Sequence, residues 1–276
     1  MKNYDFLGGE IIAFDKPLTW TSFNLVKVVR NNLSRRLGIK RLKVGHAGTL
    51  DPLATGVLIL CTGQKTKLID QLQAGTKEYI ATLRLGATTP SFDAEHPVDA
   101  TFPTAHITRE AVEEALTHFL GSIWQVPPTY SACKVEGRRA FDYMRQGEEV
   151  ELKAKELVID EIELLDLNLP EQGIRSPHAS EVMLPAEVDI KAYDQPLDYQ
   201  GDCQEVPYLQ IRVVCSKGTY IRALARDIGK ALGSGAYLIG LRRTRVGDIT
   251  VEDCLQLDNV EQWAAEVPLA PQDPDK

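Results

Sequence analysis

The sequence has few cysteines and no long apolar run. Its five cysteines are an odd number, and no two of them form a CxxC pair. We therefore expect neither a disulfide framework nor a zinc knuckle, and a reducing cytoplasm fits best. The apolar stretch 57–61 is far too short to span a bilayer, and no basic segment followed by an apolar one opens the chain. These absences predict a cytoplasmic protein with no signal peptide and no membrane contact.

Motifs for nucleotides and metals are also missing. Neither GxxxxGK[ST] nor GxGxxG occurs, and residues 63–66 only mimic the end of the first. No group of candidate ligands has the spacing of a metal site. We therefore expect no cofactor and no metal.

The charge is unevenly distributed along the chain. The net charge of −8 is unfavourable for binding nucleic acid. However, residues 160–205 have a net charge of −10 and residues 252–276 have −6, so the other 205 residues have +8. The segment 27–43 holds seven cations and no acid. From charge alone, this segment fits a solvated face or a surface that binds phosphates.

The apolar periodicity predicts a mixture of strands and helices without regular βαβ alternation. Residues 57–61 fit either a buried strand or the start of a helix. Residues 45–56 are predicted to be a loop, and Ser22 is a candidate helix cap. We expect an α+β fold with a largely antiparallel sheet. The predicted strands are 10–14, 79–85 and 208–215, with one or two more over 150–167. The predicted helices are 22–37, 108–120 and 221–232.

The segment GHAGTLDPLATG, residues 45–56, is the most informative part of the sequence. Its three glycines in twelve residues permit tight turns and close approach of a ligand. Pro52 favours an extended backbone at Asp51, which fixes how the carboxylate projects. An ordinary Asp-Pro turn and a catalytic aspartate both fit these local facts.

The longer stretch GHAGTLDPLATGVL resembles the catalytic motif of the TruB family of tRNA pseudouridine synthases. Further stretches resemble other motifs of this family in order and spacing, over about residues 10–165 and 208–250. The resemblance implies a pseudouridine synthase fold, with a central mixed, largely antiparallel sheet flanked by helices. The matching stretches are Asp15-Lys16-Pro17, Lys77-Glu78-Tyr79, residues 128–134 with Gly137, Ala140, Tyr143, Arg145 and Gly147, then residues 216–222 and 241–244.

The resemblance also implies how the chain is organised. A catalytic domain is expected over residues 1–255. Its acidic stretch at about 168–206, rich in proline and weak in periodicity, is predicted to be an insertion or a long hairpin, and its charge should point it away from RNA. Residues 256–276 are expected to form a short C-terminal helix or tail with a disordered end. The RNA-binding PUA domain of many family members is not expected, so the catalytic domain would grip the tRNA elbow alone, including through residues 27–43.

The resemblance assigns catalysis to Asp51, whose carboxylate must stay ionised beside the nucleotide. Arg222 resembles the arginine that pairs with this aspartate and keeps it charged. The carboxylate has three possible roles: attack on the ribose C1′, attack on the base, or removal of the C2′ proton. Without the resemblance, Arg222 reads as a surface cation at the start of a helix.

The remaining site residues would receive an everted uridine. Tyr79 resembles the family's stacking tyrosine, although a core tyrosine on a strand also fits. Tyr220 and Leu241 would complete the pocket, or belong to the core. His46 resembles the histidine that fills the space of the flipped base, and Lys16 would support the site or meet phosphate.

Asp93 is the least secure match. The family usually shows T-D-T-x-D-x-x-G, whereas residues 89–96 read TPSFDAEH. The first acid and the final glycine are missing, which puts a polar role of Asp93 near the uracil in doubt.

The predicted function is formation of pseudouridine at uridine-55 of tRNA, through contacts with the T arm and elbow, by a monomer that needs no guide RNA. One rival is a non-catalytic tRNA-binding or tRNA-folding protein on the same fold. A second is a guide-dependent pseudouridylase, which relies on the PUA domain. A third, an aspartate-nucleophile hydrolase or phosphatase, would need a second carboxylate near Asp51, as in DxDxT.

Overall fold

The computed structural model describes residues 3–131, 133–135, 137–140, 143, 146, 148, 150–174, 206–256 and 260–271. Most of the acidic insertion (175–205), the last five residues, and the motif residues Ala132, Arg145 and Gly147 lie outside this part. The chain divides into two compact units, unit 1 (1–77 and 242–276) and unit 2 (78–241). Strand β12 (Ala236–Val246) passes from unit 2 into unit 1.

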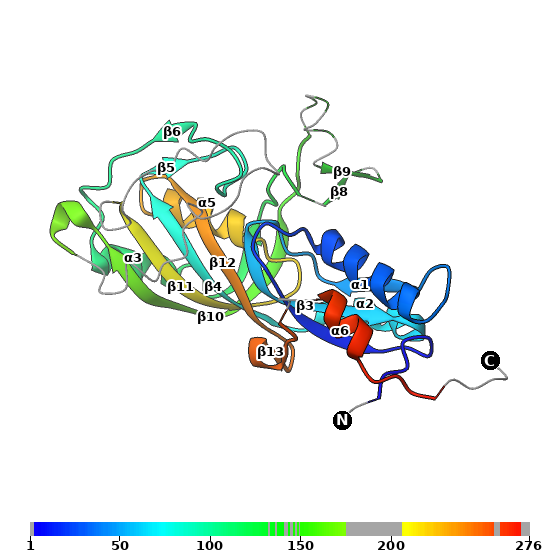
Figure 1. Ribbon diagram of the computed structural model, residues 1–276. Coiled ribbons are helices and arrows are strands. Elements are labelled where there is room, and N and C mark those ends of the chain that lie inside the picture. The colour runs from blue at the N-terminus through cyan, green and yellow to red at the C-terminus, as the bar shows by residue number, and fades with distance from the viewer. Residues whose placement is uncertain are drawn as a thin grey trace. The chain divides into compact units, whose positions relative to one another are not determined.

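Unit 1 combines a small sheet with helices. Its strand order is β1-β3-β12, with β2 paired to β3 and β13 paired to β12. Helices α1 and α6 lie side by side, as Figure 1 shows, and Trp263 of α6 packs edge-on against Phe14 of β1 with ring centroids 5.4 Å apart. The elements are β1 (Ile11–Lys16), α1 (Ser22–Arg36), β2 (Val44–Ala47), β3 (Ala54–Thr62), η1 (Gly63–Leu68), α2 (Ile69–Ala74), β13 (Ile249–Thr250), η7 (Val251–Asp253) and α6 (Val260–Glu266).

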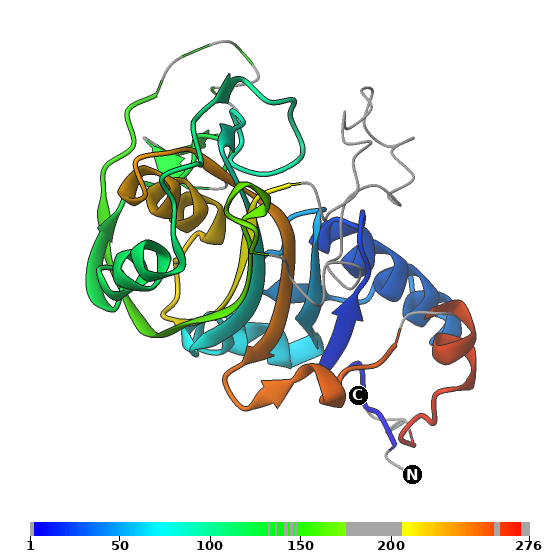
Figure 2. The same ribbon diagram turned by 90° about the vertical axis from the view of Figure 1, so that its left-hand side faces the viewer.

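Unit 2 contains the larger part of the sheet, in the order β12-β4-β11-β10-β7. Helices α3 and α5 cover one face of it (Figure 2). The elements are β4 (Lys77–Leu85, whose first residue belongs to unit 1), β5 (Ala87–Thr88), β6 (Ala100–Thr101), α3 (Arg109–Thr117), β7 (Gly121–Gln125), β8 (Lys134–Val135), β9 (Arg138–Arg139), β10 (Lys155–Asn168), η2 (Pro170–Gln172), β11 (Tyr208–Cys215) and α5 (Ile221–Ala231).

The predicted α+β class and mixed, largely antiparallel sheet are confirmed. The strand pair β1–β3 and the ladder β7–β10–β11 are antiparallel, while Asp93 and Leu238 form an isolated parallel bridge. Residues 57–61 belong to strand β3, so they are a buried strand and not the start of a helix. The prediction of a loop over 45–56 was wrong at both ends, because β2 pairs with β3 and only 48–53 remain outside the strands.

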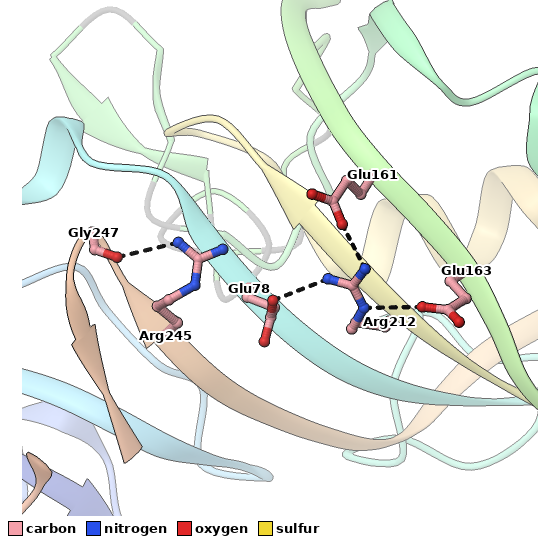
Figure 3. Close-up of polar contacts among 6 residues, drawn as sticks. All are labelled: Glu78, Glu161, Glu163, Arg212, Arg245 and Gly247. Atoms are coloured by element: carbon pink, nitrogen blue, oxygen red, sulfur yellow. Dashed lines mark hydrogen bonds and ion pairs between the residues drawn. The ribbon is translucent and has the colours of Figure 1, made fainter. Parts of the chain in front are cut away.

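An ion-pair network links the three neighbouring strands β4, β11 and β10 of unit 2 (Figure 3). Arg212 of β11 binds Glu78 of β4 at 3.0 Å and Glu163 of β10 at 3.1 Å, and it also contacts Glu161. The carboxylates, Glu161 above all, raise the pKa of Arg212. Three acids around one cation leave this surface with an excess of negative charge.

Candidate functional site

The Asp51 loop, residues 48–53, connects β2 and β3 in unit 1. Gly48 has a φ of 93°, a left-handed conformation that favours glycine. The Thr19 amide donates to the Pro52 carbonyl at 2.9 Å, and the Ala54 amide donates to the Asp51 carbonyl at 3.1 Å. Asp51 itself is half-buried. Hydrogen bonds therefore fix the backbone around this carboxylate.

Ser22 anchors the loop through Leu50. Its buried hydroxyl donates to the Leu50 carbonyl at 2.9 Å and accepts from the Leu50 amide at 2.8 Å. The prediction that Ser22 caps helix α1 was wrong by one residue. Thr21 is the cap, because its Oγ1 accepts from the Asn24 amide at 3.0 Å. Ser22 is thereby available to hold the residue before Asp51.

Lys16 is another buried anchor of the Asp51 loop. The side chain is fully buried, and its Nζ donates to the carbonyls of Trp20 at 2.6 Å, Pro17 at 2.8 Å and Pro52 at 3.4 Å. These contacts favour the supporting role over a phosphate contact, because a fully buried ammonium group does not reach the surface.

The environment of Lys16 is unfavourable for its charge. Burial lowers the pKa of Lys16 from 10.5 to about 7, which Asp51 opposes by attraction and the Arg243 guanidinium reinforces by repulsion. The group therefore titrates near neutral pH.

Arg243 of β12 is a third buried anchor, and the sequence alone gave it no role. Its guanidinium donates from Nε to the Val57 carbonyl at 2.8 Å and from Nη2 to the Gly48 carbonyl at 3.1 Å. A Cβ at Gly56 would come within 2.1 Å of the Arg243 carbonyl oxygen, so only glycine fits there. The available signal was the two adjacent arginines, Arg242 and Arg243, that follow the mostly apolar residues 236–241 of β12.

His46 lies on β2 and is half-buried. Burial lowers the pKa of His46, Arg243 lowers it further, and a hydrogen bond with the Gly48 backbone opposes this. The imidazole is therefore neutral at pH 7.

The Arg222 cluster, formed by Ser91, Asp93, Tyr130 and Arg222, is the second centre and lies within unit 2. Arg222 is 5% exposed, so it is not a surface cation. It donates to the Ser91 carbonyl at 3.1 Å and to the Tyr130 carbonyl at 2.9 Å. Its Nε lies 3.5 Å from Oδ2 of Asp93.

Asp93, whose role the sequence left in doubt, is thus the buried carboxylate facing Arg222. It is 3% exposed, and its Oδ1 accepts from the Ser91 hydroxyl at 2.5 Å and from the Glu95 amide at 3.0 Å. The local turn supplies these hydrogen bonds although the first acid and the final glycine of the family motif are missing.

Tyr220 precedes helix α5 and is half-buried. Its amide donates to Oε1 of Gln125 at 2.9 Å. Gln125 ends strand β7, is 1% exposed, and was not identified from the sequence. It is a polar residue that positions the start of the helix bearing Arg222.

Tyr79 and Leu241 lie on strands of unit 2. Tyr79 is buried on β4 on the same side as Ala81, Leu83 and Leu85, as the alternation predicted. Leu241 is half-buried on β12. Their burial fits both a core role and a pocket role.

The cations of residues 27–43 are solvent-facing. All except the half-buried Arg30 are exposed, and none forms an ion pair with a carboxylate in the part of the chain that the structure describes. In that same part, no three His, Cys, Asp or Glu side chains gather as a metal site would require. Among the described helices, none combines the length and apolarity that crossing a membrane requires.

Comparisons with known proteins agree on one family. The model of the TruB family pseudouridylate synthase N-terminal domain matches residues 34–183, and that of the tRNA pseudouridylate synthase B C-terminal domain matches residues 222–270. A tRNA pseudouridine synthase B from Bacteroides thetaiotaomicron is 59% identical over 94% of this chain and 94% of its own length. The protein of that name from Deinococcus radiodurans is 40% identical over 91% of this chain and 78% of its own length.

Solved structures show a similar fold. A crystal structure of a Cbf5-Nop10-Gar1 complex matches with a TM-score of 0.57 and 23% identity, over 94% of this chain and 55% of that chain. An H/ACA RNP bound to a substrate RNA containing 2′-deoxyuridine matches with a TM-score of 0.56 and 23% identity, over 94% of this chain and 54% of that chain. At this identity, the likeness concerns the fold alone.

Proposed function

Because this chain belongs to the TruB family of pseudouridine synthases, we propose that it converts uridine-55 in the T arm of tRNA to pseudouridine, with Asp51 as the catalytic residue. The family and its relatives support a tRNA pseudouridine synthase. The choice of uridine-55, action by a monomer without guide RNA, and a cytoplasmic location complete the proposal.

The anchored Asp51 loop is the observation that supports this proposal most. Lys16, Ser22 and Arg243 all hold the loop through its backbone, and all three are buried. Three buried polar anchors are costly for a simple surface turn, because each must be desolvated. A loop held this firmly suits a carboxylate that must meet a sugar or base in one geometry.

The proposed reaction breaks the bond between N1 of uracil and C1′, turns the base, and joins C5 to C1′. The C5 proton is lost and N1 gains one, so no redox partner or group donor is required. Asp51 would act as an ionised carboxylate by attacking C1′, attacking the base, or removing the C2′ proton.

The target base must leave the RNA stack, which costs a few kcal/mol. We assign its binding to Tyr79 as the stacking ring, with Tyr220 and Leu241 completing the pocket, and Arg222 as the partner cation. His46 would occupy the space that the base vacates, and a neutral imidazole suits a stacked environment better than a charged one.

The distribution of charge supports residues 27–43 as the surface that would bind RNA. The exposed cations of residues 27–43 have no carboxylate partner among the described residues, so they can neutralise phosphates. The acid-rich surface around Arg212 (Figure 3) would repel phosphates. The catalytic domain therefore has a basic surface for the T arm.

The test is an isomerisation assay on unmodified tRNA transcript with site-resolved mapping of pseudouridine. Wild type should modify uridine-55, and Asp51→Asn should lose at least a thousandfold in rate, because the amide cannot act as nucleophile or base. Asp70→Asn, on an exposed position of α2, is the matched control and should retain activity.

Two results would contradict the proposal. A wild-type protein that binds tRNA but leaves uridine-55 unmodified would favour the non-catalytic tRNA-binding function. An Asp51→Asn variant as active as wild type would remove Asp51 from the mechanism.

A further inference from the structure

The chain contains no acidic residue between Lys16 and Asp51. The 34 residues 17–50 hold seven cations and no Asp or Glu. They comprise helix α1 and the approach to the Asp51 loop. A phosphate backbone would meet no repelling side chain along this stretch.

Phe23 is exposed at the start of that stretch. It lies in the first turn of α1 and is 59% exposed, whereas the buried side of the helix is formed by Leu25, Val26, Val29 and Leu33. Phe23 therefore adds little to the core. Single exposed apolar side chains are common, so exposure alone decides nothing, and the surroundings must be considered.

The surroundings of Phe23 are cationic. Lys27 and Arg30 follow it at spacings of four and three, which places all three on one face of the helix. Neither cation forms an ion pair with a carboxylate among the residues that the structure describes. This face thus presents one aromatic ring beside two uncompensated charges.

The same face begins next to the Asp51 loop. Ser22, the residue before Phe23, is bonded twice to Leu50, the residue before Asp51. Thr19 holds the other side through the Pro52 carbonyl at 2.9 Å, and its φ of 68° is a strained value for threonine. The first turn of α1 is therefore fixed to the loop that holds the proposed catalytic carboxylate.

We propose that Phe23 stacks on an unpaired base of the RNA beside the target nucleotide, while Lys27 and Arg30 bind the adjacent phosphates. The inference rests on the proposed function for the identity of the target. An aromatic ring with flanking cations is how proteins bind single-stranded nucleic acid, because every base offers a π-face and every linkage a charge. A strand that delivers its ribose to Asp51 would pass this ring.

A second copy of the chain is a less suitable partner for this face. Two cationic α1 helices would repel each other, whereas a polyanion would be attracted. Trp124 on edge strand β7 provides a contrast, since it is 71% exposed but its cross-strand neighbour is Glu156. Glu156 would repel phosphate, so Phe23 and Trp124 differ in the partner they suit.

The experiment measures the affinity of the full chain for a T-arm stem-loop RNA at several NaCl concentrations. Phe23→Ala should weaken binding about tenfold at every salt concentration without changing the slope of log K against log[salt], because stacking releases no counterion. Lys27→Ala should instead reduce the magnitude of that slope by about 0.7 to 0.9. Phe23→Trp should restore the affinity, and Trp124→Ala should leave it unchanged.

Either an unchanged affinity of Phe23→Ala or a changed salt slope would overturn the inference. So would a Phe23→Ala variant that alters sedimentation of the free protein while binding RNA normally, since this would identify a protein interface. A thermal melt checks that the variant is folded, as expected for an exposed position. Modification of uridine-55 by wild type, measured in parallel, separates failure of this inference from failure of the proposed function.

Discussion

The Asp51 loop and the Arg222 cluster both depend on buried cations, but the cations have different partners. Arg243 and Lys16 donate to backbone carbonyls. Arg222 also donates to two carbonyls, yet it faces the carboxylate of Asp93 as well. One centre is therefore anchored by dipoles and the other by an ion pair.

The difference affects how each centre tolerates its buried charge. Burial lowers the pKa of Lys16 to about 7, and the repulsion from Arg243 adds to this effect. Arginine keeps its proton at any physiological pH, so the buried charge of Arg243 persists and its guanidinium donates to the carbonyls of Val57 and Gly48. A carboxylate partner compensates the buried charge more fully. However, a mutation that removes the carboxylate then leaves a buried cation unpaired.

Arg243→Met should have the largest effect on stability. It leaves the carbonyls of Val57 and Gly48 without their charged donor, at a cost of about 2 kcal/mol each, or about 4 kcal/mol in all. Urea unfolding gives the value. Arg245→Met, on the same strand and half-exposed with a bond to the Gly247 carbonyl (Figure 3), is the control and should cost about 1 kcal/mol or less. Equal losses would show that burial of Arg243 is unimportant.

Asp93→Ala should destabilise unit 2 by about 3 kcal/mol, because it removes the buried carboxylate that faces Nε of the buried Arg222. Asp93→Asn retains an oxygen acceptor for Ser91 and Glu95 and should cost less. Urea unfolding of both variants checks the order. If Asn and Ala were equally harmful, the charge of Asp93 would matter more than its hydrogen bonds.

Because of Lys16, the free energy of unfolding should depend on pH. Its pKa is about 7 in the folded chain and 10.5 as the ordinary value, so between these pH values the unfolded chain binds the additional proton. Stability should therefore rise with pH above 7, by about 1 kcal/mol per unit, and this gain should be absent in Lys16→Met. The measurement is the difference in unfolding free energy between the two proteins at pH 7, 8 and 9. A constant difference would contradict the depressed pKa.

The smallest effect concerns two threonine residues that cap α-helices, Thr21 in unit 1 and Thr108 in unit 2. Thr21 accepts from the Asn24 amide at 3.0 Å and Thr108 from the Ala111 amide at 3.2 Å. Replacing either by Ala should cost about 1 kcal/mol, and Ser should restore it. Hydrogen exchange would show whether Thr21→Ala loosens unit 1 alone and Thr108→Ala unit 2 alone. Loosening of both units by either variant would show that they unfold together.

Local periodicity was sufficient for several elements. Strand β11 and helices α3 and α5 lie where apolar spacing and turn residues predicted them. The prediction failed where pairing with a distant strand decided the outcome, as at β2, whose short glycine-containing segment becomes a strand only by bonding to β3.

The sequence by itself determined the family and the residues proposed for the site, because the motif around Asp51 and its companions is local and ordered along the chain. The tertiary structure decided which distant groups hold those residues in place. Ser22 holds Leu50, Arg243 holds Gly48, and Asp93 faces Arg222. These pairs are separated by 28 to 195 residues, and no pattern within one segment records which distant group meets a buried charge or hydroxyl.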